Sequence, residues 1–343
     1  MASNTPFRDP TALAKLIGSA PLFIRAIELI PAAARSEAAV LISGETGTGK
    51  ELVARAIHYL SDRAGFPFVG VNCGSFTDTL LENELFGHQR GAFTGAQART
   101  EGLITQAHRG TLFLDEVDTL PPKAQVDLLR VVQDKKFRPV GSSSEQEANV
   151  RIVAATNAAM EGLLRAGTFR QDLYYRLCVF SIHLPPLRDR KEDISTLAAH
   201  FLSKHAPADK PNLRLTRSAI AGLIAWEWPG NVRELENAII RGIYLCQADS
   251  IEASDLGLPS DAEKLTSPTC WNLAQTQSFT SEKRKVIKAF EKEYLIRLMS
   301  EHRGNVTHAA RAAGKERRDF GKLLKRHGLD RKLFRAVAVG LPQ

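Results

Sequence analysis

A glycine-rich heptapeptide near the start of the chain has the composition of a phosphate-binding loop. It reads Gly44-Glu45-Thr46-Gly47-Thr48-Gly49-Lys50. Its glycines allow successive backbone N–H groups to converge on phosphate oxygens, and Lys50 can reach the β- and γ-phosphates of a nucleotide. The next residue is Glu51, where the general pattern has a serine or threonine whose hydroxyl holds magnesium. We therefore expect nucleotide binding here, with a magnesium ion that takes its other ligands elsewhere.

Two polar pairs follow apolar runs and could complete this chemistry. Asp115 and Glu116 end the run 111–116. A buried strand would deliver Asp115 to a metal ion and Glu116 to a water that attacks the γ-phosphate. Paired acids occur after apolar runs by chance, but the upstream glycine loop makes this reading specific. The second pair, Thr156 and Asn157, ends another apolar run and should lie level with the γ-phosphate.

Three arginines could meet a phosphate. Arg170 and Arg176 lie six residues apart, and either could equally be a surface residue in a salt bridge. Arg233 lies in the first turn of the helix that residues 228–231 begin. A cation is unfavourable at that end of a helix dipole, so we expect an anionic partner near Arg233, such as a nucleotide phosphate.

The elements that must position these residues alternate between strands and helices. Short apolar runs predict four buried parallel strands. They lie at residues 40–43, 68–72, 111–115 and 150–157. Amphipathic stretches between them predict helices, and a glycine-rich loop between a strand and a helix is the setting in which phosphate-binding loops work. The sequence thus predicts an α/β P-loop domain with a parallel sheet between helices.

After about residue 188 the strand pattern stops. Apolar spacing then predicts helices only, at 194–201, at 219–226 and from 231 onward. Residues 257–280 are rich in Ser, Thr, Pro and Gln and read as a linker. We therefore divide the chain into an N-terminal segment 1–17, an α/β subdomain 18–188, an α-helical lid 189–256, the linker 257–280 and an all-α domain 281–343.

Composition is that of a soluble globular protein of more than one domain. The chain has 343 residues, of which 43% are hydrophobic and 24% charged. No apolar run is long enough to cross a bilayer, and the first residues lack a signal pattern, so we expect a cytoplasmic location. The 4 cysteines are widely spaced with no C-x-x-C pattern, which argues against a disulfide framework and against a zinc site.

The basic residues are concentrated at the C-terminal end. Residues 281–343 carry 17 Lys and Arg against 7 Asp and Glu, whereas the rest of the chain has 29 against 31. Such an excess indicates nucleic-acid binding, although a solvated basic helix without a partner would look the same. A long helix at 282–299, a short one at 305–313, a turn at Gly314 and a basic helix at 315–326 form a helix-turn-helix pattern.

Side chains of this tail are the candidates for DNA contact. They are Thr307, Arg317, Arg318, Lys322 and Lys325. Gly321, inside the same helix, costs roughly 1 kcal/mol relative to alanine. A close approach of another backbone would explain its presence.

The hexapeptide Gly91-Ala92-Phe93-Thr94-Gly95-Ala96 separates the phosphate loop from the acidic pair. Its two glycines permit unusual backbone conformations, and Phe93 and Thr94 are its only side chains large enough to grip a partner. A glycine-rich turn with Phe93 tucked into its own core is the alternative. The position between two nucleotide motifs favours a loop that nucleotide state can move.

These motifs, in this order, closely resemble the AAA+ domain of bacterial enhancer-binding proteins, the activators of sigma-54 RNA polymerase. They read GETGTGKE, ELFGHQRGAFTGA, TLFLDEVDTL, FRQDLYYRL, LPPLRDR and WPGNVREL. The resemblance covers about residues 18–255, and the tail looks like the Fis-type DNA-binding domain of the same proteins. It implies an ATP-driven ring, usually a hexamer, whose GAFTGA loop contacts sigma-54 and remodels the closed promoter complex into the open complex.

The resemblance also implies a role for each matched residue. Nucleotide binding is implied for Gly44, Glu45, Thr46, Gly47, Thr48, Gly49, Lys50, Glu51, the sensor I pair Thr156 and Asn157, and the sensor II residue Arg233. Catalytic roles are implied for Asp115 on Mg²⁺, Glu116 on water, Asn72 as the switch of that glutamate, and Arg170 and Arg176 as fingers supplied to a neighbouring subunit. Contact with sigma-54 is implied for Gly91, Ala92, Phe93, Thr94, Gly95 and Ala96.

The expected partners are ATP with Mg²⁺, sigma-54 RNA polymerase, an upstream site on double-stranded DNA, and further copies of the chain in a dimer or hexameric ring. We expect no receiver or ligand-sensing domain before residue 18, which resembles those family members that a separate regulatory protein controls. Two other classes of protein stay open. One is a DNA-bound repressor that uses ATP only as an assembly switch, and the other is a general AAA+ unfoldase or helicase loader.

Overall fold

The computed structural model describes most of the chain from residue 13 to residue 327. The described residues are 13, 15–92, 96, 98–207, 210, 213–246, 249–258, 291, 294–296, 298–299, 302 and 304–327. They belong to two compact units, Met1–Asp261 and Ala262–Gln343. Among the described helices, none is both long enough and apolar enough to cross a membrane.

Five parallel strands form the central sheet of the first unit, in the spatial order β2-β5-β8-β1-β9. They are β1 Val40–Ser43, β2 Phe68–Asn72, β5 Thr111–Asp115, β8 Arg151–Thr156 and β9 Phe180–His183. The four strands expected from apolar runs are confirmed. The additional strand, β9, lies at an edge of the sheet, and Ile182 is its one buried residue, so it lacks the apolar run of a central strand.

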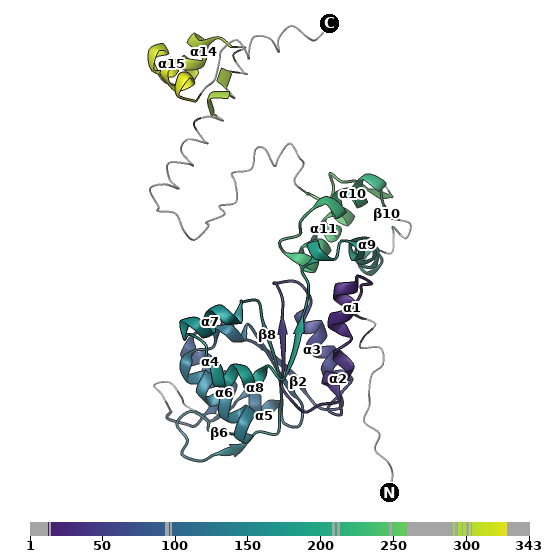
Figure 1. Ribbon diagram of the computed structural model, residues 1–343, viewed down its shortest axis with the longest axis vertical. Coiled ribbons are helices and arrows are strands. Elements are labelled where there is room, and N and C mark those ends of the chain that lie inside the picture. The colour runs from purple at the N-terminus through teal and green to yellow at the C-terminus, as the bar shows by residue number, and fades with distance from the viewer. Residues whose placement is uncertain are drawn as a thin grey trace. The chain divides into compact units, whose positions relative to one another are not determined.

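Helices cover both faces of this sheet (Figure 1). On one face lie α1 Pro21–Ile27, α2 Ile30–Ala34 and α3 Lys50–Tyr59, and on the other lie α4 Asp78–Phe86, α5 Leu103–Gln106, α6 Pro122–Asp134, α7 Met160–Ala166 and α8 Gln171–Leu177. Side chains alternate along each strand, so Leu112 and Leu114 of β5 pack into one core and Phe113 into the other. This is the predicted sheet between helices.

A helical lid follows the sheet along the chain. It contains α9 Glu192–His205, α10 Arg217–Ala225 and α11 Asn231–Leu245, with the paired short strands β10 Arg214–Leu215 and β11 Ser250–Ile251. Its core includes the fully buried Trp228, whose indole N–H donates to the carbonyl of Leu223 at 2.7 Å. The predicted lid is therefore confirmed.

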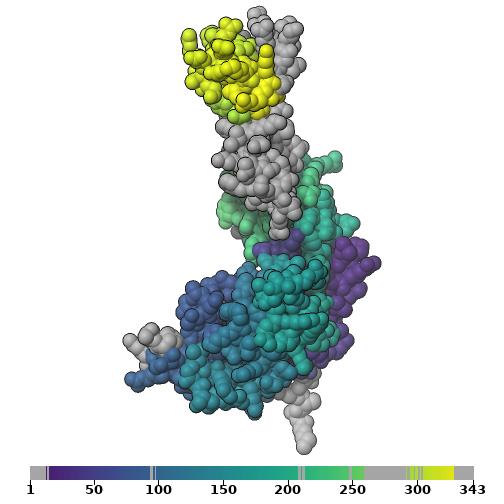
Figure 2. All heavy atoms as spheres, turned by 60° about the vertical axis from the view of Figure 1, so that its left-hand side comes forward, coloured from purple at the N-terminus to yellow at the C-terminus, as the bar shows by residue number. Residues whose placement is uncertain are grey.

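The residues before α1 are joined to the lid. Asp193 Oδ1, in the first turn of α9, accepts the backbone N–H groups of Ser19 at 2.6 Å and Ala20 at 2.9 Å. The buried Arg190 stacks on the ring of Phe23, 4.4 Å from its centroid. In Figure 2 the purple N-terminal segment accordingly lies beside both the lid and the α/β part.

Within the described residues of the second unit, two short helices are complete and pack around a small core. They are α14 Val306–Ala312 and α15 Arg317–Arg326, separated by a turn in which Gly314 has φ of 61°. Asn305 caps α14 by accepting the backbone N–H of Thr307 at 3.1 Å. The core consists of Leu295, Leu298, Met299, Ala309, Ala310, Phe320 and Leu324. These helices fit a helix-turn-helix domain, while most of the helix expected at 282–299 lies outside the described residues.

Every side chain of this unit that the sequence proposed for DNA contact is exposed. They are Thr307, Arg317, Arg318, Lys322 and Lys325. The ammonium of Lys322 donates to Asp319 at 3.0 Å on the same exposed face. A methyl group added at Gly321 would meet no described atom within 4 Å, so the expected close backbone approach at Gly321 is wrong for this part of the chain.

Candidate nucleotide-binding site

The glycine-rich loop after β1 wraps around the ammonium group of its own lysine. Gly44, Gly47 and Gly49 have φ of 153°, 80° and 104°, conformations that favour glycine. Lys50 Nζ donates to the carbonyl of Gly44 at 2.8 Å and to that of Glu45 at 3.2 Å. The ammonium therefore lies inside the loop, where it can meet a phosphate.

Three carboxylates lie close enough to Lys50 to stabilise its charge. Burial lowers the pKa of Lys50, and the negative charges of Asp115, Glu116 and Asp118 oppose this shift, whereas the positive charge of Arg233 adds to it. Asp118 is an acid that was not expected here, because it belongs to no general motif although it lies two residues after Glu116. The tertiary structure thus gathers Arg233 and three acids around one lysine.

Asn72 and Glu116 meet at the backbone of Gly74. Asn72 is the register partner of Asp115 across β2 and β5, and its Oδ1 accepts the N–H of Gly74 at 2.8 Å. A methyl group added at Gly74 would lie 2.5 Å from Glu116 Oε2. Glu116 itself has φ of 53°, a conformation that is rare for a residue with a Cβ and that clusters at functional sites.

Thr156 and Asn157 lie beside the glycine-rich loop, as the sequence predicted. Thr156 is the register partner of Ser43, the last residue of β1. Its hydroxyl donates to Asp118 Oδ1 at 2.6 Å, and Asn157 Nδ2 donates to Thr46 Oγ1 at 3.2 Å. The carboxyl ends of β1, β2, β5 and β8 therefore place the predicted polar side chains of the sheet at one edge.

An apolar cavity of about 510 Å³ adjoins the glycine-rich loop. Its walls come from the N-terminal segment, α3 and the lid, and they include Ile17, Phe23, Leu52, Leu197, Phe201 and Val232. Such a hollow next to a phosphate loop is suited to a flat, weakly polar ring. Sequence reasoning missed it because its walls come from segments far apart in the chain, each of which reads as ordinary core.

Glu51 points away from the lysine. Its carboxylate accepts hydrogen bonds from Nε and Nη2 of Arg55, at 2.9 and 2.7 Å, on the exposed surface of α3. No group of three metal-binding side chains occurs among the described residues. The acids near Lys50 offer hard oxygen ligands, which fits Mg²⁺, because this ion commonly binds one or two carboxylates together with phosphates and waters.

Arg170 and Arg176 do not join this site within the subunit. Arg170 pairs with Asp172 at 2.7 Å on the exposed surface at the start of α8. Arg176 is exposed and lines a hollow with Ala39 and Ile152, at the amino ends of β1 and β8. Lys50 follows the opposite ends of these strands, and even the four residues of β1 span about 13 Å.

The foot of the GAFTGA loop is held by two short hairpins. The first pairs β3 Gly87–His88 with β4 Thr100–Glu101, and the second pairs β6 Lys136–Phe137 with β7 Gln146–Glu147. Within the loop Gly91 N–H donates to the carbonyl of Ala96 at 2.9 Å. The expected grip by Phe93 and Thr94, and the position of Gly95, lie outside the described residues.

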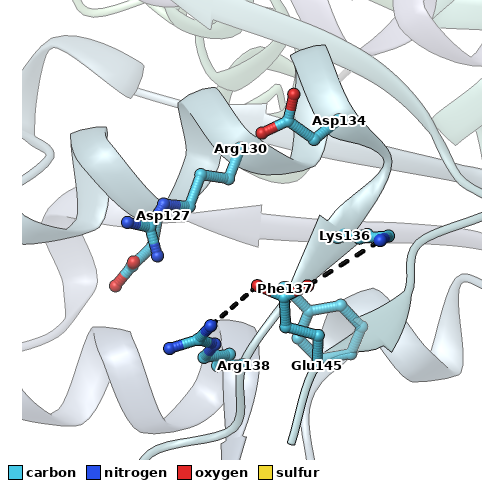
Figure 3. A pocket seen from close by; sticks show the side chains of 7 residues that line it. All are labelled: Asp127, Arg130, Asp134, Lys136, Phe137, Arg138 and Glu145. Atoms are coloured by element: carbon cyan, nitrogen blue, oxygen red, sulfur yellow. Dashed lines mark hydrogen bonds and ion pairs between the residues drawn. The ribbon is translucent and has the colours of Figure 1, made fainter.

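The second hairpin contacts the first and is braced by charges. Gln89 N–H donates to the carbonyl of Val140 at 3.0 Å, and Val140 N–H donates to the carbonyl of Gly87 at 2.8 Å. Figure 3 shows the adjoining charged hollow against α6, in which Glu145 pairs with Lys136 and Arg138. The foot of the loop is therefore connected to α6 through β6 and β7.

The strand-loop-helix geometry, the paired acids and the lid define an ATPase of the AAA+ class. Two family models match the chain: the Sigma-54 interaction domain over residues 16–183 and the AAA+ ATPase lid domain over residues 188–269. The chain belongs to this family, the AAA+ ATPases that activate sigma-54-dependent transcription.

Similar proteins cover nearly the whole chain. The transcriptional regulatory protein GlrR of Escherichia coli K12 is 42% identical over 336 residues, which are 98% of this chain and 73% of GlrR. The regulatory protein AtoC of the same organism is 43% identical over 301 residues, 87% of this chain and 64% of AtoC. Among solved structures, NtrX from Brucella abortus in complex with ATP has a TM-score of 0.69 at 34% identity, covering 95% of this chain and 71% of that one.

Proposed function

We propose that this sigma-54-dependent activator binds an upstream DNA site, assembles into a ring and uses ATP hydrolysis to move its GAFTGA loop against sigma-54. The proposal is supported chiefly by the chain segment that connects the catalytic acid Glu116 with the GAFTGA loop. Asn72 and Glu116 meet at Gly74, and the turn there leads into α4. This helix ends at Phe86, directly before β3 at the foot of the loop. A shift at one end of this helix, about 13 Å long, is felt at the other.

In this proposal the residues around Lys50 divide the chemistry among them. The N–H groups of residues 44–50 and the Lys50 ammonium bind the phosphates of ATP, and Arg233 and Asn157 contact the terminal phosphate. The apolar cavity takes the base. Asp115 would hold Mg²⁺, which would neutralise phosphate charge, and Glu116 accepts a proton from the attacking water. Thr156 and Asp118 orient this acidic edge.

The proposal predicts open-complex formation that requires hydrolysable ATP. On a sigma-54 promoter, the chain with sigma-54 polymerase should melt the DNA with ATP and leave it closed with a non-hydrolysable analogue, as read by permanganate footprinting. Thr94→Ala should retain ATPase activity and DNA binding but lose open-complex formation. Full promoter opening by Thr94→Ala would overturn the role of the loop.

Gly141→Ala should uncouple hydrolysis from promoter opening. Gly141 has φ of 76°, and a methyl group added there would lie 2.7 Å from Ala92 Cβ at the foot of the loop. The strain amounts to about 1–3 kcal/mol, so we expect open-complex formation to fall about tenfold while ATPase activity stays close to wild type. Gly162→Ala in α7 is the matched control, because its added methyl meets nothing within 4 Å. Equal opening rates for both variants would contradict this coupling.

Arg317→Ala or Arg318→Ala should weaken DNA binding. Both side chains are exposed in the first turn of α15. In a helix-turn-helix domain the N-terminal residues of the second helix contact base edges. Loss of such a contact costs about 1–3 kcal/mol, and affinity for the upstream site should fall accordingly in a binding titration. Arg311→Ala on α14 is the control: if it weakens binding as much, general charge and not α15 explains the affinity.

A further inference from the structure

The outward-facing carbonyls of the glycine-rich loop are bound by groups from the lid and from the segment that leads into it. Asn231 Nδ2 donates to the carbonyl of Thr46 at 3.0 Å, the N–H of Val232 donates to that of Gly47 at 3.0 Å, and Arg190 Nη2 donates to that of Thr48 at 3.3 Å. These carbonyls belong to the peptide groups whose N–H sides form the phosphate-binding face. Their orientation therefore depends on groups outside the loop.

Glu45 is the side chain through which this attachment is made. Its carboxylate accepts both terminal nitrogens of Arg188, at 2.6 and 2.8 Å, and Nδ2 of Asn231 at 3.1 Å. The Arg188 hydrogen bond lowers the pKa of Glu45 below its usual range, and the amide of Asn231 acts in the same direction. The carboxylate of Glu45 is thus turned toward the lid and neutralised by Arg188.

Asn231 is hydrogen-bonded both to Glu45 and to the backbone next to Arg188. It is fully buried, and its Oδ1 accepts the N–H of Leu187 at 2.8 Å. It also has φ of 54°, a conformation that is rare for a residue with a Cβ and persists only where its surroundings enforce it. Arg188 follows Leu187 directly. Asn231, at the start of α11, therefore connects the glycine-rich loop with the segment that contains Leu187 and Arg188.

We infer that Glu45, Arg188 and Asn231 form a latch that fixes the lid to the glycine-rich loop and sets ATP affinity by holding the phosphate-binding N–H groups in place. Three polar side chains act here as positioning residues. Without Arg188, the carboxylate of Glu45 loses its countercharge and keeps only the hydrogen bond from Asn231, on a loop that must accept an anion, so the loop loses both geometry and charge balance. The inference rests on the proposed nucleotide site and adds a second set of residues to it.

The competing explanation is that Arg188 contacts a phosphate directly. A double-mutant cycle separates the two, because a residue that acts through Glu45 loses its effect once Glu45 is gone. If the latch holds, Arg188→Ala in the full-length chain weakens binding of a fluorescent ATP analogue about tenfold and raises KM for ATP, with kcat within about twofold of wild type. In the Glu45→Ala background, Arg188→Ala adds no further change.

Three further variants test the latch and the nucleotide site separately. Glu45→Gln keeps an acceptor for both partners and should restore most of the affinity that Glu45→Ala loses, whereas Arg55→Ala, which removes an exposed ion pair on α3, should leave nucleotide binding unchanged. An equal loss from Arg188→Ala in both backgrounds, unchanged affinity in every latch variant, or a fall in kcat alone overturns the latch. Lys50→Ala tests the site itself: if it still binds the analogue, the nucleotide site is wrong, independently of the latch.

Discussion

Replacing Arg176 by alanine is expected to slow ATP hydrolysis about 10³-fold, the lower end of the range for arginine fingers. Arg176 lies at the amino ends of β1 and β8, whereas Lys50 follows the carboxyl end of β1. Its guanidinium therefore cannot stabilise transition-state charge in its own subunit and would have to serve a neighbouring one. Steady-state ATPase assays at a protein concentration that supports assembly measure the effect.

Mixing two inactive variants tests whether Arg176 acts between subunits. Lys50→Ala subunits are expected to lose ATP binding but still present Arg176, and Arg176→Ala subunits keep an intact glycine-rich loop. A mixture of the two should regain hydrolysis, because some subunits with an intact glycine-rich loop will lie next to a subunit that still has Arg176. Arg165→Ala, an exposed arginine in the last turn of α7, is the control and should be fully active. No recovery in the mixture, with both variants assembled, would contradict action between subunits.

Glu116→Gln is expected to lower kcat for ATP hydrolysis by about 10²–10⁴, because a glutamine keeps the shape of the side chain but cannot accept the proton of the attacking water. ATP binding should persist, since the proposed phosphate contacts come from residues 44–50, Asn157 and Arg233 and not from Glu116. Asn72 should remain bonded to Gly74, because that hydrogen bond does not involve the carboxylate. Single-turnover hydrolysis and nucleotide titration on the same protein separate the two steps.

The same variant decides between remodelling and an assembly switch. If ATP served only to assemble a DNA-bound regulator, Glu116→Gln would still support transcription, because it still binds ATP. Loss of open-complex formation with ATP binding retained favours hydrolysis-driven remodelling. Glu161→Gln, an exposed glutamate in the first turn of α7, is the control and should behave as wild type in both assays.

The sequence by itself determined the features that short contiguous segments encode. Four apolar runs marked the edge strand β2 and the three inner strands β5, β8 and β1, because a strand covered on both faces needs side chains of one kind along its length. The segment 44–50 marked the phosphate loop, because its glycines are required at positive φ. Thr156, Asn157 and Asp115 could be placed at one edge because each ends a parallel strand. The glycine turn and the basic helix after it predicted the helix-turn-helix.

Only the tertiary structure decided how distant segments meet. It turned Glu45 toward Arg188 and Glu51 toward Arg55, so that neither carboxylate of this segment faces Lys50. It brought Asp118 to the hydroxyl of Thr156 and assembled an apolar cavity from the N-terminal segment, α3 and the lid. A side chain's direction and its long-range partner depend on packing, and spacing along the chain records neither.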